Sequence, residues 1–359
     1  MPQVHLAGQP DPAASPPPRV AIVGTGAMAT VMALILDTRA VPATLFGHDP
    51  DHVDALAQTR ENTRYLPGHR FADRTVFTAD PQALFDPAPA LVVNAVPTQY
   101  VRSVWAGLAP HCPPGTPIVS VTKGIETDTL LRPTQIIQDV LAAQGPDSPD
   151  HKPRPLGALL GPTVADELAR CLPATITAAA EDPELADTLQ STFTTPWFRV
   201  YTNADLLGVE LAGATKNVIA LAAGILDGLQ AGNNAKSALL SRGLAEITRL
   251  GVAMGAKRET FFGLSGVGDL ATTCFSPTGR NRSCGEQLGR GKKLNDVLSQ
   301  IPGVVEGVAT TKAVVQLAER YRVEMPITQG IHAVLFEGLD PLDGITALMT
   351  RNPKAEHVG

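Results

Sequence analysis

The 359-residue sequence has no excess of basic residues, few cysteines and no long apolar run. Because nucleic-acid binding needs a basic surface, a formal net charge of -6 argues against a general nucleic-acid-binding protein. The four cysteines include no C-x-x-C pair, which argues against a structural zinc site or a disulfide framework and suits a reducing cytosol. The histidines form no H-E-x-x-H motif, and we therefore expect no protein-bound catalytic metal.

Membrane and export signals are also missing from the sequence. No run of about 18 uninterrupted apolar residues occurs, so we expect no membrane span. Residues 1–18 lack a cationic start followed by an apolar stretch, and their Pro, Ala, Gly and Asp content predicts a disordered leader rather than a signal peptide. These absences favour a cytoplasmic protein.

The length and the apolar content predict two domains. A chain of 359 residues exceeds one small domain, and a hydrophobic fraction of 44% with 18% charged residues is enough for two cores. The pattern of apolar residues changes near residue 204. We therefore expect a first domain over residues 19–204 and a second over residues 205–359.

The first domain has the pattern of a Rossmann-type, doubly wound parallel sheet. Its short apolar runs, separated by helix-length stretches, predict strands that are buried on both faces. The first strand is followed at once by glycines and by a predicted helix over Met28–Leu36. The predicted strands are Arg19–Gly24, Ala43–Phe46, Ala90–Val96, Pro117–Val121 and Leu156–Leu160.

The second domain is expected to be all-helical, because strand signals become scarce after residue 204. Thr202–Asp205 (TNAD) is a possible start for its first helix. The predicted helices are Leu206–Leu229, Ala238–Met254, Ser283–Arg290, Thr310–Tyr321 and Gln329–Leu335.

The turn Gly24–Ala29 (GTGAMA) is a G-x-G-x-x-A motif between a predicted strand and a predicted helix. Gly24 would form the turn, Gly26 would let the backbone approach a pyrophosphate, and the small Ala29 would keep helix and strand close. The helix N-terminus would offer free N–H groups to the phosphates. The motif alone also fits an ordinary turn, but its setting predicts dinucleotide binding.

The second predicted strand leads into Gly47-His48-Asp49. An NAD-specific site normally has an acidic residue at this strand tip, and Asp49 comes slightly late. His48 could bond to or partly neutralise a 2′-phosphate, or it could be a solvated turn residue. The choice between NAD and NADP therefore stays open.

Lys216 lies mid-helix in GATKNVIA, among apolar residues. Burying an amine there is costly unless it is paired or functional, and an amine in such a place suits proton transfer. The alternative is a lysine whose chain reaches solvent from the helix edge.

A second cluster comprises Gly263–Leu270 (GLSGVGDL) and Ser276–Arg282 (SPTGRNR). Its glycines predict a poor helix and a flexible anion-binding loop, in which Arg280 can hold a phosphate through two parallel hydrogen bonds. Asp269 could orient an amine such as that of Lys216. The alternative is a solvated glycine-rich linker.

Two further segments follow predicted strands in the first domain. Lys123 comes just after one strand, in SVTKG, and Gly161-Pro162-Thr163 comes just after another. Ligands gather at the carboxyl ends of parallel strands, so both segments are candidates for the site.

Together these motifs resemble the NAD(P)-dependent glycerol-3-phosphate dehydrogenase family. The matching stretches, in the family's order from about residue 19 to 330, are IVGTGAMAT, LFGHDPDH, SVTKGIE, GPTVADEL, GVELAGATKNVIALAAG, ETFFGLSGVGDLATTCFSPTGRNR, VVEGVATTKAV and VEMPIT. The resemblance implies a Rossmann domain before an all-helical domain, NAD or NADP as cofactor, and a homodimer. It also implies reversible reduction of dihydroxyacetone phosphate to sn-glycerol 3-phosphate, for glycerophospholipid synthesis.

The resemblance further implies roles for single residues. Lys216 would exchange a proton with the C2 oxygen of the substrate, Lys123 would contact substrate and cofactor, and Asp269 would complete the polar cluster. The implied substrate-binding positions are Lys123, Gly161, Thr163, Lys216, Asn217, Asp269, Thr273, Gly279, Arg280 and Asn281. The cofactor-binding positions, from the turn and the resemblance, are Gly24, Gly26, Ala27, Met28, Ala29, His48, Lys123, Ala165, Arg280, Val304 and Glu306.

Two segments depart from many bacterial members of that family. Ala27-Met28 stand where a serine and an aromatic residue are common, and Gly279 replaces a serine before R-N-R. We therefore expect the pyrophosphate to be bound by backbone N–H groups, and a phosphate contact from the Gly279 backbone. Thr273 is an additional candidate hydroxyl.

Two other functions fit parts of this pattern. A two-domain reductase of 2-keto acids would also use a lysine and an arginine, but the R-N-R loop together with the T-K-N helix argues against it. A nucleotide sensor that had lost its chemistry would be expected to lack one of Lys123, Lys216 and Asp269, and all three are present.

Overall fold

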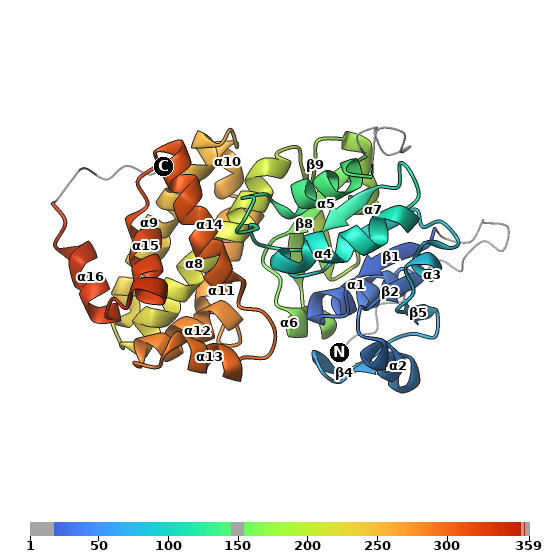
Figure 1. Ribbon diagram of the computed structural model, residues 1–359, viewed down its shortest axis with the longest axis horizontal. Helices are drawn as coiled ribbons and strands as arrows, with labels where there is room; N and C mark the ends of the chain where they lie inside the picture. Colours follow the sequence, from blue (N-terminus) through green and yellow to red (C-terminus); the bar gives the residue numbers. More distant parts are fainter. Residues whose placement is uncertain (1–17, 145–153, 353–354, 356–359) are drawn as a thin grey trace.

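The computed structural model describes residues 18–144, 154–352 and 355. They form a half built on a sheet and a half built of helices, which lie side by side along the long axis (Figure 1). The predicted leader falls almost wholly in residues 1–17, outside the described residues.

One eight-stranded sheet organises the first half, in the order β10-β9-β8-β7-β6-β1-β2-β5. Every neighbouring pair is parallel except β8 and β9, which are antiparallel. The predicted parallel, doubly wound sheet is confirmed, and the antiparallel pair involves β9, a strand that the sequence analysis did not predict. The strands are β1 (Val20–Val23), β2 (Ala43–Phe46), β5 (Thr75–Thr78), β6 (Leu91–Asn94), β7 (Ile118–Ser120), β8 (Leu156–Leu160), β9 (Ala174–Ala180) and β10 (Phe198–Asn203).

The sheet is doubly wound about β1, whose two neighbours are β2 and β6. Ligands of such sheets bind where the strand order reverses, at the carboxyl ends of these strands. A two-stranded hairpin, β3 (Glu61–Asn62) and β4 (Leu66–Arg70), follows α2. The helices of this half are α1 (Ala27–Thr38), α2 (Pro50–Thr59), α3 (Pro81–Phe85), α4 (Thr98–Leu108), α5 (Pro133–Ala142), α6 (Ala165–Ala169) and α7 (Pro183–Phe193).

No strand occurs among the described residues after β10, as the scarcity of strand signals predicted. Asp205 starts the first helix of this half by accepting a hydrogen bond from Gly208 N at 2.9 Å. The helices are α8 (Leu206–Gly228), α9 (Gly232–Ala253), α10 (Arg258–Phe261), α11 (Asp269–Phe275), α12 (Arg280–Gly289), α13 (Leu294–Gln300), α14 (Glu306–Tyr321), α15 (Pro326–His332) and α16 (Pro341–Met349).

The loop predicted at Gly263–Leu270 is wrong, whereas Ser276–Gly279 is a turn, as the prediction for Ser276–Arg282 requires in part. Leu264–Gly268 forms a π-helical turn, α11 follows it, and Arg280 opens α12. One of the glycines serves close packing: a Cβ on Gly266 would lie 2.0 Å from Phe261 O. The sequence pattern cannot distinguish a glycine needed for close approach from one needed for flexibility.

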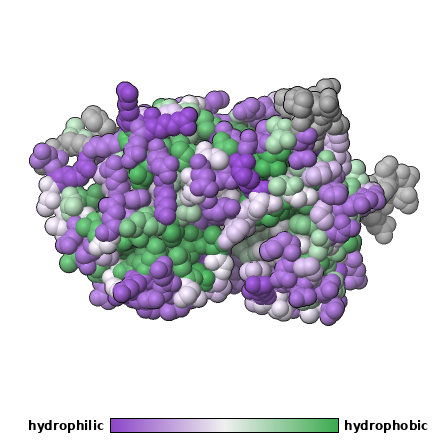
Figure 2. Space-filling model, viewed as in Figure 1, coloured by the Kyte–Doolittle hydropathy of each residue, from purple (hydrophilic) through white to green (hydrophobic). Residues whose placement is uncertain are grey.

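The helix α8 is the centre of the helical half. It is long and apolar enough to cross a membrane by composition, but its apolar window is completely buried inside the protein. Helices α9, α11, α12 and α14 pack around it. At the surface, apolar side chains gather over the lower part of this half in the view of Figure 2.

Candidate active site

Two lysines and one aspartate from distant parts of the chain meet where the two halves join. Lys216 lies in the middle of α8, Asp269 is the first residue of α11, and Lys123 follows β7. Lys216 Nζ lies 2.7 Å from Asp269 Oδ1, and Lys123 Nζ lies 2.7 Å from Asp269 Oδ2. The side chain of Asp269 is 2% exposed, so both ammonium groups are held by a carboxylate that water hardly reaches.

Burial and charge set the chemistry of this cluster. Burial lowers the pKa of Lys123 to about 8; Asp269 opposes that shift and the nearby charge of Lys216 adds to it. With both amines protonated, the three side chains carry a net positive charge. Such a cluster can polarise a carbonyl oxygen and supply a proton to it.

Lys123 also connects the cluster to the end of β8. Its Nζ donates to Gly161 O at 2.8 Å and to Thr163 Oγ1 at 3.2 Å. The structure therefore brings Gly161 and Thr163 beside the two lysines. Ala165, the first residue of α6, packs at the margin of the sheet's apolar core.

A chain of amide hydrogen bonds links the cluster to α12 and α14. Asn217 Nδ2 donates to Lys123 O at 3.1 Å, and Asn281 Nδ2 donates to Asn217 Oδ1 at 3.0 Å. Gly307 N in turn donates to Asn281 Oδ1 at 2.9 Å. Asn281 thus fixes the start of α12, where Arg280 is the first residue, relative to the lysines.

Arg280 is the cation at this end of α12. Burial lowers its pKa, and the carboxylate of Glu306 opposes that shift. Gly303, whose φ of +83° favours glycine, lies beside this guanidinium: a Cβ there would lie 2.7 Å from Arg280 Nη1. Gly279 precedes α12 in an extended conformation, and Thr273 is half-buried in α11.

The glycine turn after β1 has the features that a dinucleotide needs. Gly24 has a φ of +118°, and a Cβ there would lie 3.0 Å from Ala95 O. A Cβ on Gly26 would meet nothing within 4 Å, so a ligand can approach this backbone. No side chain caps the N-terminus of α1, where Ala27 and Met28 stand, and Ala29 is fully buried against the core. The uncapped N–H groups fit an anionic pyrophosphate.

Glu306 brings the helical half onto the sheet half near this turn. It opens α14, two residues after Val304, and its Oε1 accepts a hydrogen bond from Thr98 N at the start of α4, at 2.9 Å. Burial raises the pKa of Glu306 to about 7. His48 lies exposed just past β2.

Sequence analysis missed three residues that shape this region. Asn62 donates to Thr25 O in the glycine turn, Arg64 pairs with Asp49, and Thr98 bonds to Glu306. Thr98 lies four residues after the end of β6, at the switch point of the sheet, and that position could have identified it. No local pattern singles out Asn62 or Arg64.

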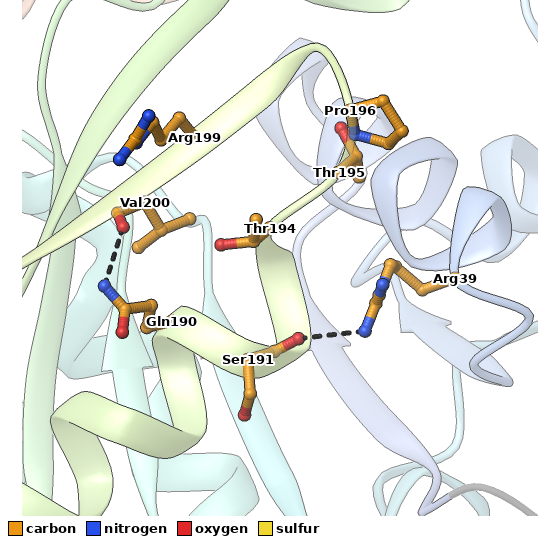
Figure 3. A pocket seen from close by; sticks show the side chains of 8 residues that line it. All are labelled: Arg39, Gln190, Ser191, Thr194, Thr195, Pro196, Arg199 and Val200. Atoms are coloured by element: carbon orange, nitrogen blue, oxygen red, sulfur yellow. Dashed lines mark hydrogen bonds between the residues drawn. The ribbon is translucent and has the colours of Figure 1, made fainter. Parts of the chain in front are cut away.

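A shallow cavity of about 650 Å³ elsewhere in the sheet half does not have these features. It lies between the C-terminal ends of α1 and α7 and the start of β10 (Figure 3). Arg39 and Arg199 stand on opposite sides of it, and Arg39 already donates to Ser191 O at 3.2 Å. Its polar groups do not converge on one point, so the cluster around Asp269 is the better candidate.

The chain is similar to known proteins along almost its whole length. Two family models match it: the N-terminus of NAD-dependent glycerol-3-phosphate dehydrogenase matches residues 19–186, and the C-terminus of the same enzyme matches residues 205–346. The glycerol-3-phosphate dehydrogenase (NAD(P)+) of Geobacter sp. (strain M21) is 43% identical over 340 residues, covering 95% of this chain and 99% of that protein. That of Prosthecochloris aestuarii is 44% identical over 337 residues, covering 94% and 99%.

Solved structures show the same likeness. A glycerol-3-phosphate dehydrogenase from Coxiella burnetii superposes with a TM-score of 0.87 at 33% identity, covering 93% of this chain and 99% of that one. A ketopantoate reductase from Ralstonia eutropha has a TM-score of 0.57 at 15% identity, covering 91% of this chain and 99% of that one, and shares the fold alone.

Proposed function

Because this chain belongs to the NAD-dependent glycerol-3-phosphate dehydrogenase family, we propose that it reversibly reduces dihydroxyacetone phosphate to sn-glycerol 3-phosphate with NADH or NADPH. The observation that carries this proposal is the pair of lysines on Asp269, held 2.7 Å from its two oxygens. The product is a precursor of glycerophospholipids, and we assign the protein to that synthesis in the cytoplasm.

The residues at the glycine turn fit a dinucleotide, since Gly26 is open and the N-terminus of α1 is uncapped. The bound cofactor supplies the hydride. Gly24 and Gly26 with Ala27–Ala29 hold the pyrophosphate through backbone N–H groups. His48, Lys123, Ala165, Arg280, Val304 and Glu306 complete the dinucleotide site.

In the proposed reaction, hydride adds to C2 of the ketone and Lys216 gives its proton to the C2 oxygen, which becomes the hydroxyl. Lys123 polarises the same oxygen, and Asp269 keeps both amines in place. In the reverse direction Lys216 takes that proton back. Holding the reacting groups in place accounts for a large part of such rate enhancements.

Arg280 anchors the substrate phosphate and so orients C2. Its planar guanidinium can make two parallel hydrogen bonds to phosphate oxygens. The other residues assigned to the substrate are Gly161, Thr163, Asn217, Thr273, Gly279 and Asn281. Asn217 and Asn281 already bond to each other, which fixes their orientation before substrate arrives.

We further propose that residues 19–204 bind the dinucleotide, that residues 205–359 bind the substrate, and that the protein is a homodimer. The apolar surface of the helical half supports a dimer, because exposed apolar patches mark interaction sites (Figure 2). Exposed large apolar side chains of this half are Val252, Phe262, Phe275, Tyr321, Leu342 and Met349. Sedimentation of the purified protein measures its subunit number.

The deciding experiment follows NADH and NADPH oxidation side by side with dihydroxyacetone phosphate, and with ketopantoate as the control substrate. We expect oxidation with dihydroxyacetone phosphate and none with ketopantoate. Turnover of ketopantoate alone would make the protein a 2-keto acid reductase. Cofactor binding without turnover of either substrate would contradict an enzymatic role.

A further inference from the structure

The end of β2, where an NAD-specific site places its acidic residue, offers no free carboxylate. Gly47, the first residue past the strand, is buried, and a Cβ there would lie 2.6 Å from Val53 Cγ2 and 2.9 Å from Thr25 Cγ2. The chain therefore excludes a side chain at that position. His48 follows and is exposed.

Asp49, the nearest acidic residue, is used elsewhere. Its Oδ1 accepts a hydrogen bond from His52 N at 3.3 Å and so caps α2. Its Oδ2 lies 3.5 Å from Arg64 Nη1. Each oxygen of Asp49 therefore already has one partner, and the contact through Oδ2 places Arg64 beside the position that an NAD-specific carboxylate would occupy.

The turn that carries Arg64 is fixed to the dinucleotide site. Asn62, fully buried, donates through Nδ2 to Thr25 O and to Thr30 Oγ1, both at 2.8 Å. Tyr65 N donates back to Asn62 Oδ1 at 3.2 Å. Thr25 lies between the two glycines of the turn. Asn62, two residues before Arg64, is therefore hydrogen-bonded to the backbone that would bind the cofactor.

The guanidinium of Arg64 is available to a ligand. Its side chain is 59% exposed, and it stacks over the ring of Tyr65 at 5.1 Å from the centroid. Its pair with Asp49 is long and solvated, and such pairs contribute little. Burial lowers the pKa of His52, and the charge of Arg64 lowers it further.

We propose that Arg64 binds the 2′-phosphate of NADP and makes this protein prefer NADP over NAD. The inference rests on the proposed function, because it presumes that the glycine turn holds a dinucleotide. A dianionic phosphate gives the guanidinium fork two charged acceptors, which the solvated contact with Asp49 cannot match. The ribose diol of NAD would meet an arginine and a carboxylate that already caps α2 and contacts that arginine.

The test measures dissociation constants of NADPH and NADH by quenching of tryptophan fluorescence, without substrate. We expect the natural protein to bind NADPH more tightly than NADH. Arg64→Ala should weaken NADPH binding roughly ten- to a hundredfold, the usual effect of losing a charged hydrogen bond, and leave NADH binding within about twofold. Asp49→Asn, which keeps a capping side chain, should bind NADPH at least as tightly as the natural protein.

The control is Arg39→Ala, which removes an exposed arginine at the far end of α1 and should change neither constant. A second measurement needs no variant: adenosine 2′,5′-bisphosphate should displace NADPH at lower concentration than adenosine 5′-monophosphate. Equal affinity of the two mononucleotides, equal loss of both cofactors in Arg64→Ala, or weaker NADPH binding in Asp49→Asn would overturn the inference.

These binding constants separate this inference from the proposed function. Discrimination through Arg64 without reduction of dihydroxyacetone phosphate would refute the proposed function alone. Reduction of dihydroxyacetone phosphate with equal affinity for both cofactors would refute the role of Arg64 alone.

Discussion

At the scale of single residues, Lys216 and Lys123 occupy equivalent positions on the two oxygens of Asp269, yet their surroundings differ. Lys216 bonds only to Asp269 among the described residues, whereas Lys123 also donates to Gly161 O and Thr163 Oγ1. The ammonium of Lys216 therefore has more freedom to give a proton to a substrate oxygen. That of Lys123 is held by three acceptors and suits a fixed positive charge.

Replacing Lys216 with alanine tests this division of roles. We expect kcat to fall by about a factor of 10²–10⁴, the usual contribution of a proton donor, while the dissociation constant of the cofactor stays the same. Steady-state kinetics and fluorescence titration measure the two quantities. Lys292→Ala, at an exposed position, is the control and should retain full turnover. Unchanged turnover in Lys216→Ala would remove that lysine from the mechanism.

The pH profile tests Lys123. Because burial lowers the pKa of this amine to about 8, it carries its charge below that pH and loses it above. We expect kcat/KM for reduction of dihydroxyacetone phosphate to fall as the pH rises through about 8. Arg replaces Lys with a group that stays protonated, so Lys123→Arg should keep its residual activity to higher pH. The same alkaline decline in both proteins would assign it to another group.

At the scale of elements, the contact between α8 and α12 positions the arginine of the site. Glycines of both helices face the partner backbone: a Cβ would lie 1.9 Å from Arg282 O at Gly224 and 2.0 Å from Leu221 O at Gly285. The two helices can lie this close only without side chains at these positions. Since α12 begins with Arg280, this packing also fixes the backbone position from which the Arg280 side chain extends.

Gly224→Ala should therefore destabilise the fold. We expect a loss of about 3 kcal/mol in the free energy of unfolding, because the added methyl group overlaps backbone that cannot move aside. The matched control is Gly330→Ala in α15, where a Cβ would meet nothing within 4 Å. That change should be neutral or stabilising by about 0.5–1 kcal/mol, since alanine favours helix. Urea denaturation of both variants measures the difference, and equal effects would contradict the packing argument.

The elements also show what the sequence could predict. Short, mostly apolar runs identified β1, β2, β6, β7 and β8, whose residues are almost all buried. The strands β5, β9 and β10 of the large sheet and the small hairpin β3–β4 were missed. In β10 buried and exposed residues alternate at the edge of the sheet, and β9 is rich in alanine, which has low strand propensity.

In the site, too, the sequence identified only residues that are unusual within their local segment. Lys216 and Asp269 could be identified because a lysine in an apolar helix and an aspartate among glycines are locally unusual. Lys123 could be identified because it comes just after a predicted strand. Asn62 could not be found in this way, because only its tertiary contacts make it distinctive, and Thr98 could be found only from its place after a predicted strand. The contacts of Asn62 and Thr98 join residues 37 and 208 positions apart.

At the scale of the whole molecule, two glutamates from the helical half cap helices of the sheet half. Glu210 of α8 accepts from Thr134 N at 3.0 Å and Thr134 Oγ1 at 2.7 Å at the start of α5, and pairs with Arg132. Glu306 of α14 caps α4 through Oε1 alone, while its buried Oε2 has no hydrogen-bond partner among the described residues. Two carboxylates thus join the halves: both oxygens of Glu210 accept hydrogen bonds, whereas only one oxygen of Glu306 does so in the described part of the chain.

Because one oxygen of Glu306 lacks a hydrogen bond from any residue that the structure describes, we expect the stability of the contact between the two halves to depend on pH. Burial raises the pKa of Glu306 to about 7 in the folded protein, above its ordinary value of 4.5. The folded state therefore keeps this proton at a pH where the unfolded chain has lost it. The resulting contribution to stability is complete below about pH 4.5 and is lost as the pH rises through about 7.

Glu306→Gln isolates this contribution, because the amide oxygen can still accept from Thr98 N but the side chain cannot ionise. We expect the natural protein to lose stability relative to the variant between pH 5 and 8, by an amount on the order of 2 kcal/mol. Urea denaturation at several pH values measures the two curves. Glu246, a buried carboxylate whose pKa is likewise raised to about 7, is present in both proteins and cancels in the difference. Parallel curves would show that Glu306 does not ionise in this range, and its link to α4 would then hold the halves together equally at every pH.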